Sequence, residues 1–98
     1  MPASVIARVD ITDRQQYLKY TAIAPAAIIR YGGRVIARSE DPVTLEGPEE
    51  RRRIIIIGFP SVERAKEWYD SPEYRQAREI RKDAAAGELI VVEEFVPG

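Results

Sequence analysis

The chain has 98 residues, of which 45% are apolar and 32% charged, and its formal net charge is −1. These values are typical of one globular domain in water, and they give no reason to expect nucleic acid or an anionic membrane as a partner. The absence of histidine and cysteine excludes imidazole bases, histidine-ligated metals, disulfides and thiol chemistry.

We therefore expect a single domain over residues 1–98 that uses neither a metal nor a cofactor. The longest aliphatic run, residues 54–57, is too short to span a bilayer. No basic segment followed by an apolar stretch opens the chain. These features predict a cytoplasmic protein without a membrane partner.

The first third of the chain predicts a strand and a helix. Residues 4–11 alternate between apolar and polar side chains, which is typical of a strand with one buried face. Thr12, followed three residues later by Gln15, predicts a capping box at the start of a helix. The pair Gly32-Gly33 predicts the end of that helix.

Two strands separated by a long loop are expected next. A short strand covers residues 34–38, and residues 39–50 form an acidic loop with a hairpin edge around Val43–Leu45. Loops of this length in a small domain are often lids. Residues 54–59 form a third strand, preceded by the three arginines 51–53, which act as gatekeepers against aggregation.

The last third predicts a broken helix and a final strand. Ser61 is the expected N-cap of the first helical piece. Ser71, followed by Pro72, repeats the same signal and predicts a break followed by a second piece. Gly87 is expected to end the helical region, and residues 88–96 form the last strand.

This order predicts an α+β, ferredoxin-like β-α-β-β-α-β sandwich with four antiparallel strands and all helices on one face. The other sheet face should then be polar, but the third strand is apolar on both faces and the fourth nearly so, with Phe95 included. A second copy, paired sheet to sheet, is the simplest cover for such a surface. We expect a homodimer.

Several short segments from the first helix onward form a fairly specific set: Tyr31-Gly32-Gly33, Ala37-Arg38, Leu45-Glu46-Gly47, Phe59-Pro60-Ser61, Ala65, Trp68-Tyr69, Ser71-Pro72-Glu73-Tyr74 and Arg81. This set resembles the DUF1330 family of the dimeric α/β-barrel superfamily. The resemblance implies a ferredoxin-like subunit that pairs through its sheet. It implies no established activity, because the family is named for lacking one.

Aromatic residues around the helix break are the first candidates for a binding site. Trp68, Tyr69 and Tyr74 could line a pocket for an aromatic or unsaturated ligand. The alternative is that they anchor the helices on the sheet, because aromatic residues at helical spacing are most often core. Tyr20, on the first helix, is a further candidate for a hydrogen bond to a ligand.

Charged residues supply the other candidates. Arg78 and Arg81 could bind a carboxylate, or they could pair with nearby acids such as Glu73 and Glu79. Arg38 is another candidate ligand-binding residue, and it could form a buried pair with Glu46 at the mouth of the pocket. A partly buried Glu46 would be the most plausible general base, and the alternative is a structural salt bridge that holds the loop.

The sequence therefore predicts a homodimer that binds a small organic molecule, anionic or aromatic, between the sheet and the helices. Cofactor-free proton transfer of the isomerase type, with Glu46 as the base, is the expected chemistry if the protein is an enzyme. The alternative is a non-catalytic metabolite-binding module or a structural dimerisation module.

Overall fold

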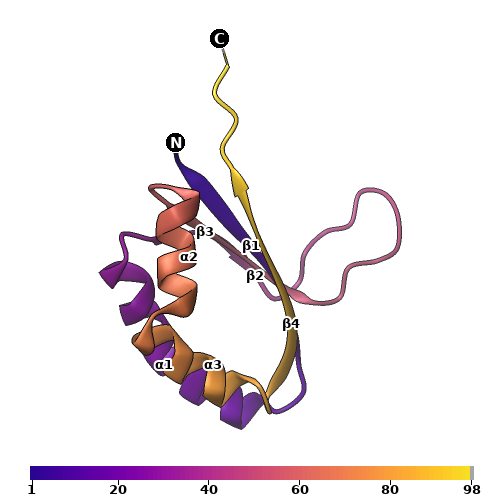
Figure 1. Ribbon diagram of the computed structural model, residues 1–98. Helices are drawn as coiled ribbons and strands as arrows, with labels where there is room; N and C mark the ends of the chain where they lie inside the picture. Colours follow the sequence, from indigo (N-terminus) through magenta and orange to yellow (C-terminus); the bar gives the residue numbers. More distant parts are fainter. Residues whose placement is uncertain (98) are drawn as a thin grey trace.

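The computed structural model describes residues 1–97. Its elements are β1 (Ala3–Ile11), α1 (Arg14–Arg30), β2 (Arg34–Ser39), β3 (Arg53–Phe59), α2 (Val62–Asp70), α3 (Pro72–Arg81) and β4 (Ala85–Glu93). The strands form one antiparallel sheet in the order β2-β3-β1-β4, and the helices cover one of its faces (Figure 1). The expected ferredoxin-like fold is confirmed. Within residues 1–97, no helix is long and apolar enough to cross a membrane.

Helix α1 begins one residue later than the sequence predicts. Its N-cap is Asp13, whose side chain accepts a hydrogen bond from the Gln16 amide at 3.1 Å. Thr12 is not the cap, because its hydroxyl donates to the Ala84 carbonyl at 3.1 Å and so ties the start of α1 to the turn before β4. Gly32 ends the helix with a φ of 80°, as expected.

The break between α2 and α3 is confirmed and centres on Ser71. The Ser71 hydroxyl donates to the Trp68 carbonyl at 2.7 Å and accepts from the Tyr74 amide at 3.1 Å. It therefore satisfies the end of one helix and the start of the next. Pro72 occupies the first turn of α3, where its missing N–H costs nothing.

The bounds of β4 differ from the prediction. The strand starts at Ala85 and ends at Glu93, because it pairs with β1 along the whole length of that strand. Gly87 therefore lies inside the strand, and Phe95 lies beyond it with 84% of its surface exposed. Residues 94–97 extend past the sheet (Figure 1).

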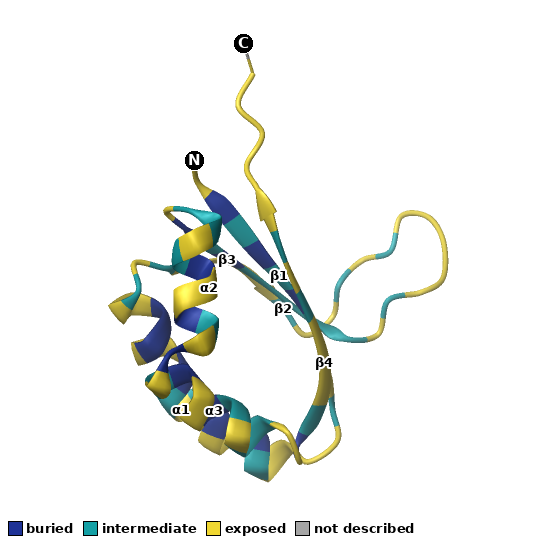
Figure 2. Ribbon diagram, viewed as in Figure 1, coloured by how far each residue is buried: buried dark blue, intermediate teal, exposed yellow. Residues whose placement is uncertain are grey.

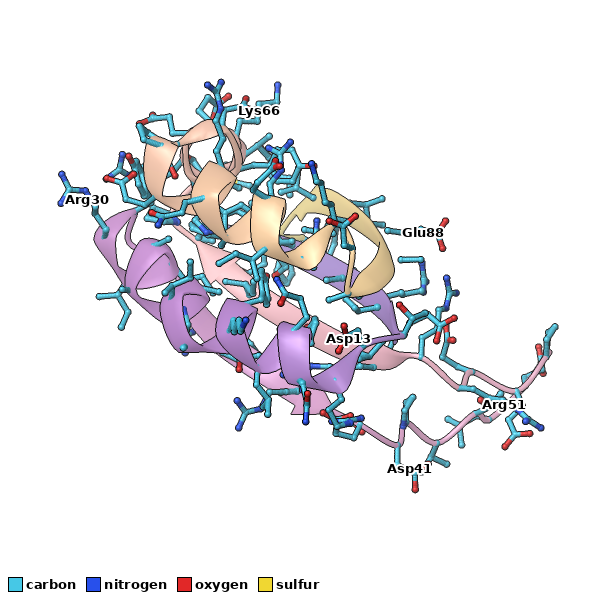
Figure 3. The ribbon with its side chains drawn as sticks, turned by 90° about the horizontal axis from the view of Figure 1, so that it is seen from below. Asp13, Arg30, Asp41, Arg51, Lys66 and Glu88 are labelled. Atoms are coloured by element: carbon cyan, nitrogen blue, oxygen red, sulfur yellow. The ribbon has the colours of Figure 1, made fainter. Side chains whose placement is uncertain are left out.

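The long loop between β2 and β3 contains no strand, so the expected hairpin edge at Val43–Leu45 is absent. The loop projects away from the helices (Figure 1), and Asp41 and Arg51 lie on this projecting part (Figure 3). Its base is fixed by Glu50, which pairs with Arg52 at 2.9 Å and with Arg8 at 3.5 Å.

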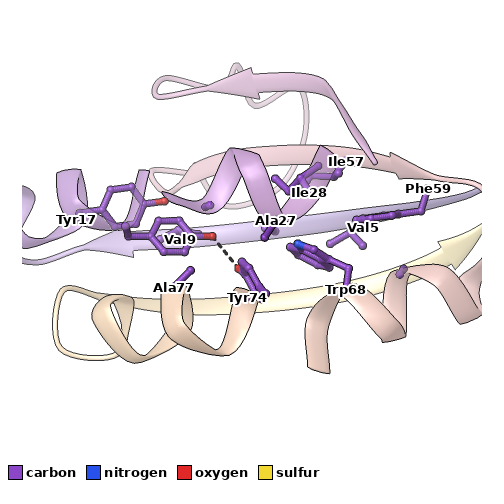
Figure 4. Packing of buried hydrophobic residues seen from close by; sticks show 14 of the residues in the cluster. Val5, Val9, Tyr17, Ala27, Ile28, Ile57, Phe59, Trp68, Tyr74 and Ala77 are labelled. Carbon is purple, nitrogen blue, oxygen red and sulfur yellow. Dashed lines mark hydrogen bonds between the residues drawn. The ribbon is translucent and has the colours of Figure 1, made fainter. Parts of the chain in front are cut away.

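The hydrophobic core lies between the helices and the sheet (Figure 4). The sheet contributes apolar residues from alternate positions, such as Val5 and Val9 of β1 and Ile57 of β3. Trp68 and Tyr74 pack onto them from the helices. Both aromatic residues are 1% exposed.

The opposite face of the sheet also carries apolar residues, and Figure 2 shows that much of β4 is exposed. Ile6 of β1 pairs with Ile56 on one side and Ile90 on the other, so three isoleucines form a row across three strands. Ile90 is 51% exposed. We call this surface the open sheet face; it comprises Ile6, Ile36, Ile54, Ile56, Ile90 and Val92.

Candidate functional site

Most of the residues predicted to bind a ligand form one connected group in the structure. Trp68 and Tyr74 stack with ring centroids 4.2 Å apart, and Tyr69 lies against both. Tyr20 meets Tyr74 edge to face. Arg78 and Arg81 lie over the rings of Tyr69 and Tyr20, respectively.

One hydrogen bond joins two buried side chains inside this group. The hydroxyls of Tyr20 and Tyr74 lie 2.7 Å apart and share a hydrogen bond (Figure 4). Burial raises the pKa of both tyrosines. Both hydroxyls are therefore protonated at neutral pH, and they can act as hydrogen-bond donors but not as bases.

Tyr69 and Arg78 form the boundary of this group with solvent. The Arg78 guanidinium lies 4.1 Å from the centroid of the Tyr69 ring, and its Nη1 donates to the Tyr69 carbonyl at 3.0 Å. These two contacts fix the guanidinium at the junction of α2 and α3. Such a stacked guanidinium keeps further N–H groups for a planar anion.

The expected pairing of these arginines with acids of α3 does not occur. Glu73 pairs with Arg30 at 3.0 Å and accepts from the Tyr31 hydroxyl at 3.1 Å. Glu79 pairs with Lys82. Within residues 1–97, Arg78 and Arg81 have no acidic partner at ion-pairing distance, so their charge is available to a ligand.

Two hollows lie along the edge strand β4, and Tyr69 lines both. We call them together the β4 groove. The apolar half, about 180 Å³, lies against α2 and is lined by Val5, Ala65, Lys66, Trp68, Tyr69, Asp70, Leu89, Ile90 and Val91. The cationic half, about 530 Å³, lies against α3 and is lined by Tyr69, Arg75, Arg78, Glu79, Arg81, Lys82, Ala85 and Gly87.

Gly87 of β4 lies beside Arg81 in the cationic half. A Cβ at this position would lie 3.6 Å from Nη1 of Arg81. The guanidinium therefore lies at ordinary contact distance from this part of β4. The sequence predicts Gly87 at the end of the helical region, and its place in this hollow follows only from its position inside β4.

Arg38 and Tyr20 line a different cavity, of about 90 Å³, between α1 and the strands β2 and β3. Two residues that the sequence analysis did not select, Tyr17 and Arg53, line it as well. The spacing of Tyr17 and Tyr20 along one helix face was the available signal. Tyr20 thus contacts both groups of candidates: it packs against Tyr74 and Arg81 on one side and against Tyr17 on the other.

Glu46 lies in neither the groove nor this cavity. It is exposed in the projecting loop, next to Leu45, which is 95% exposed. The expected pair with Arg38 does not form within the chain, because Arg38 borders the cavity under α1 while the loop projects from the side of the sheet away from the helices. In the described part of the chain, no cluster of acidic residues could hold a metal ion.

Comparison with known proteins supports the fold and leaves the activity open. The family model described as "Domain of unknown function (DUF1330)" matches residues 2–95. The chain is similar to the crystal structure of a protein of unknown function from Rhodopseudomonas palustris, with 25% identity, a TM-score of 0.79 and coverage of 98% of this chain and 84% of that one.

A more distant likeness is to SnoaB, a cofactor-independent oxygenase from Streptomyces nogalater, with 9% identity, a TM-score of 0.69 and coverage of 98% and 95%. At this identity the likeness shows the fold alone. No curated protein matches the sequence significantly.

Proposed function

We infer that this protein, a member of the DUF1330 family of domains of unknown function, binds a small organic acid with an apolar or aromatic body. The β4 groove is the binding site. The apolar half of the groove would hold the body, beside Trp68 and Tyr69. The cationic half would hold the carboxylate, beside Arg78 and Arg81.

The observation that carries this proposal is the placement of Arg78. Its guanidinium is fixed over Tyr69, lacks an acidic partner within residues 1–97, and stands where the apolar and cationic halves meet. A guanidinium binds a carboxylate through two parallel hydrogen bonds. A molecule with a carboxylate at one end and hydrocarbon at the other matches this arrangement, whereas a uniformly polar molecule leaves the apolar half empty.

Homodimerisation through the open sheet face belongs to the same proposal. Ile90 lines the apolar half of the groove and is also part of the open sheet face. A second copy packed on that face would bury the isoleucine row and remove an apolar patch from water. It would also shield the apolar half of the groove on the side of Ile90.

Cofactor-free proton transfer is the second candidate function, and one observation favours it. The loop that carries Glu46 projects on the side of the sheet where a second copy would pack. A carboxylate from the partner's loop would then act as the base on a ligand held by the arginines. Under this reading, Glu46→Gln abolishes turnover of a bound acid but leaves its affinity unchanged.

Isothermal titration with 3-phenylpropionate tests the binding proposal. We expect saturable binding that Arg78→Gln weakens by about tenfold or more, because a charge-assisted contact is lost. Arg64→Gln is the matched control: Arg64 also stacks on a tyrosine, Tyr31, at 4.9 Å, but lies outside the groove. Absence of binding, or equal losses in the two variants, would overturn the proposal.

A further inference from the structure

The cavity under α1 has features of a second binding site, separate from the β4 groove. It lies between α1 and the β2–β3 side of the sheet, whereas the groove follows β4 at the opposite edge. We call it the α1 cavity. The α1 cavity shares no lining residue with the β4 groove.

Two buried donors in the α1 cavity lack an acceptor. Tyr17 is 2% exposed, and its hydroxyl has no hydrogen-bond partner in the described residues. The Arg53 side chain is 13% exposed, and its Nε is likewise unpaired. The Arg53 guanidinium lies 5.6 Å from the centre of the Tyr17 ring, so the two donors are neighbours. Buried polar groups normally have partners, and two unpaired donors in one cavity indicate a missing acceptor.

The charge at the cavity favours an anion as that acceptor. Arg53 donates through Nη1 to Glu40, and Arg14 also approaches Glu40, at 3.7 Å. The Glu40 carboxylate therefore pairs with two arginines. Arg38 lines the cavity and has no acidic partner at ion-pairing distance within residues 1–97. The surroundings remain positive after this pairing is taken into account.

The walls restrict which anion fits. Apart from the donors, the cavity is lined largely by apolar side chains: Ala24, Pro25, Ile28, Val35, Ile55 and Ile57. Its volume of about 90 Å³ exceeds the ~10–15 Å³ needed for one water molecule. An inorganic oxyanion needs donors on every side, which these walls lack. A carboxylate with a short hydrocarbon chain needs them at one end only.

We propose that the α1 cavity binds a short-chain aliphatic carboxylate, with Tyr17, Arg53 and Arg38 as donors to the carboxylate and the apolar walls around its chain. The Tyr17 hydroxyl is suited to this role because it is protonated at neutral pH. The residues differ from those of the β4 groove, so the two sites can be tested independently.

Titration of the protein with sodium butyrate, followed by amide chemical shifts, tests this assignment. Saturable shifts are expected around Tyr17, Val35 and Arg53. Tyr17→Phe should weaken binding by about tenfold, because a hydrogen bond to a charged group is lost. Tyr69→Phe, a matched change in the β4 groove, should leave unchanged the affinity measured from the shifts around Tyr17, Val35 and Arg53. Neutral butyramide and inorganic phosphate should bind at least about tenfold more weakly.

The Tyr17→Phe variant also controls for folding. Its hydroxyl has no partner to lose, so the ligand-free variant should melt at or above the wild-type temperature while binding butyrate less well. The proposal is overturned if butyrate causes no saturable shift up to about 50 mM. The proposal is also overturned if Tyr17→Phe and wild type bind butyrate with equal affinity. Chemical-shift changes confined to the β4 groove would overturn it as well.

Discussion

At the residue scale, the hydroxyl pair of Tyr20 and Tyr74 joins α1 to α3 inside the core. Tyr74→Phe removes one partner and leaves the other hydroxyl buried without a bond. We expect a loss of about 1–3 kcal/mol in the free energy of unfolding, measured by urea denaturation. The double change Tyr20→Phe with Tyr74→Phe should cost less than the sum of the single changes. Strict additivity would show that the two hydroxyls do not interact.

Glu73 makes stability depend on pH in the acidic range. Its pKa is lowered, first by the backbone amide at the start of α3 and then by the Tyr31 hydroxyl and Arg30. A carboxyl with a lowered folded-state pKa stabilises the protein above its unfolded pKa, about 4.3, and loses this contribution as the pH falls through the folded value.

Thermal melts between about pH 6 and pH 3 should therefore show a larger decline for wild type than for Glu73→Gln. Glu63→Gln, in the first turn of α2, is the control, and it should decline as wild type does. Parallel curves for wild type and Glu73→Gln would contradict a role for Glu73.

At the element scale, the joint between α2 and α3 depends on Ser71, which is 4% exposed. Ser71→Ala should destabilise the protein by about 1–2 kcal/mol, because the amide of Tyr74 loses its acceptor. Because Tyr69 and Arg78 lie on the two sides of this joint, the variant should also bind 3-phenylpropionate more weakly. Ser39→Ala, which removes an exposed contact to Asp41, should change neither property.

Local sequence signals predicted the helix caps and the order of the elements. They did not predict the bounds of β4 or the contacts of the long loop. Ser61 and Ser71 each accept a hydrogen bond from the backbone amide three residues later. Such a short spacing can be recognised in a sequence. The bounds of β4 could not be predicted in this way, because they follow from pairing with β1, more than 70 residues away. The Arg38–Glu46 pair failed for the same reason: the direction of a loop is set by the whole sheet.

Part of the candidate site was also visible in the sequence. For Trp68, Tyr69 and Tyr74 the sequence left open whether they line a pocket or anchor the helices. In the structure the three rings pack against one another, and Trp68 and Tyr74 are buried in the core. That Arg78 lacks an acidic partner could not be predicted, because Glu73 is taken by Arg30 and Tyr31 of another helix. The position of Gly87 in the groove could not be predicted either, because it depends on the pairing that places β4 beside Arg81.

At the scale of the whole molecule, the open sheet face is the feature that a single copy leaves unexplained. If two copies pack through this face, Ile56→Lys places a charge in the interface and should dissociate the dimer at micromolar concentration. Light scattering coupled to size exclusion measures the mass. Ile29→Lys, an equally drastic change on the exposed surface of α1, should leave the dimer intact. A wild-type monomer at these concentrations would refute the assembly.

The central claim is that the β4 groove selects an anionic molecule with an apolar body, and Trp68 provides a direct reporter of it. Trp68 is the single tryptophan of the chain and lines the apolar half of the groove. Its fluorescence should change saturably with 3-phenylpropionate, and the neutral 3-phenylpropionamide should need a concentration about tenfold higher or more for the same change. An unchanged spectrum, or equal response to the acid and the amide, would contradict the account.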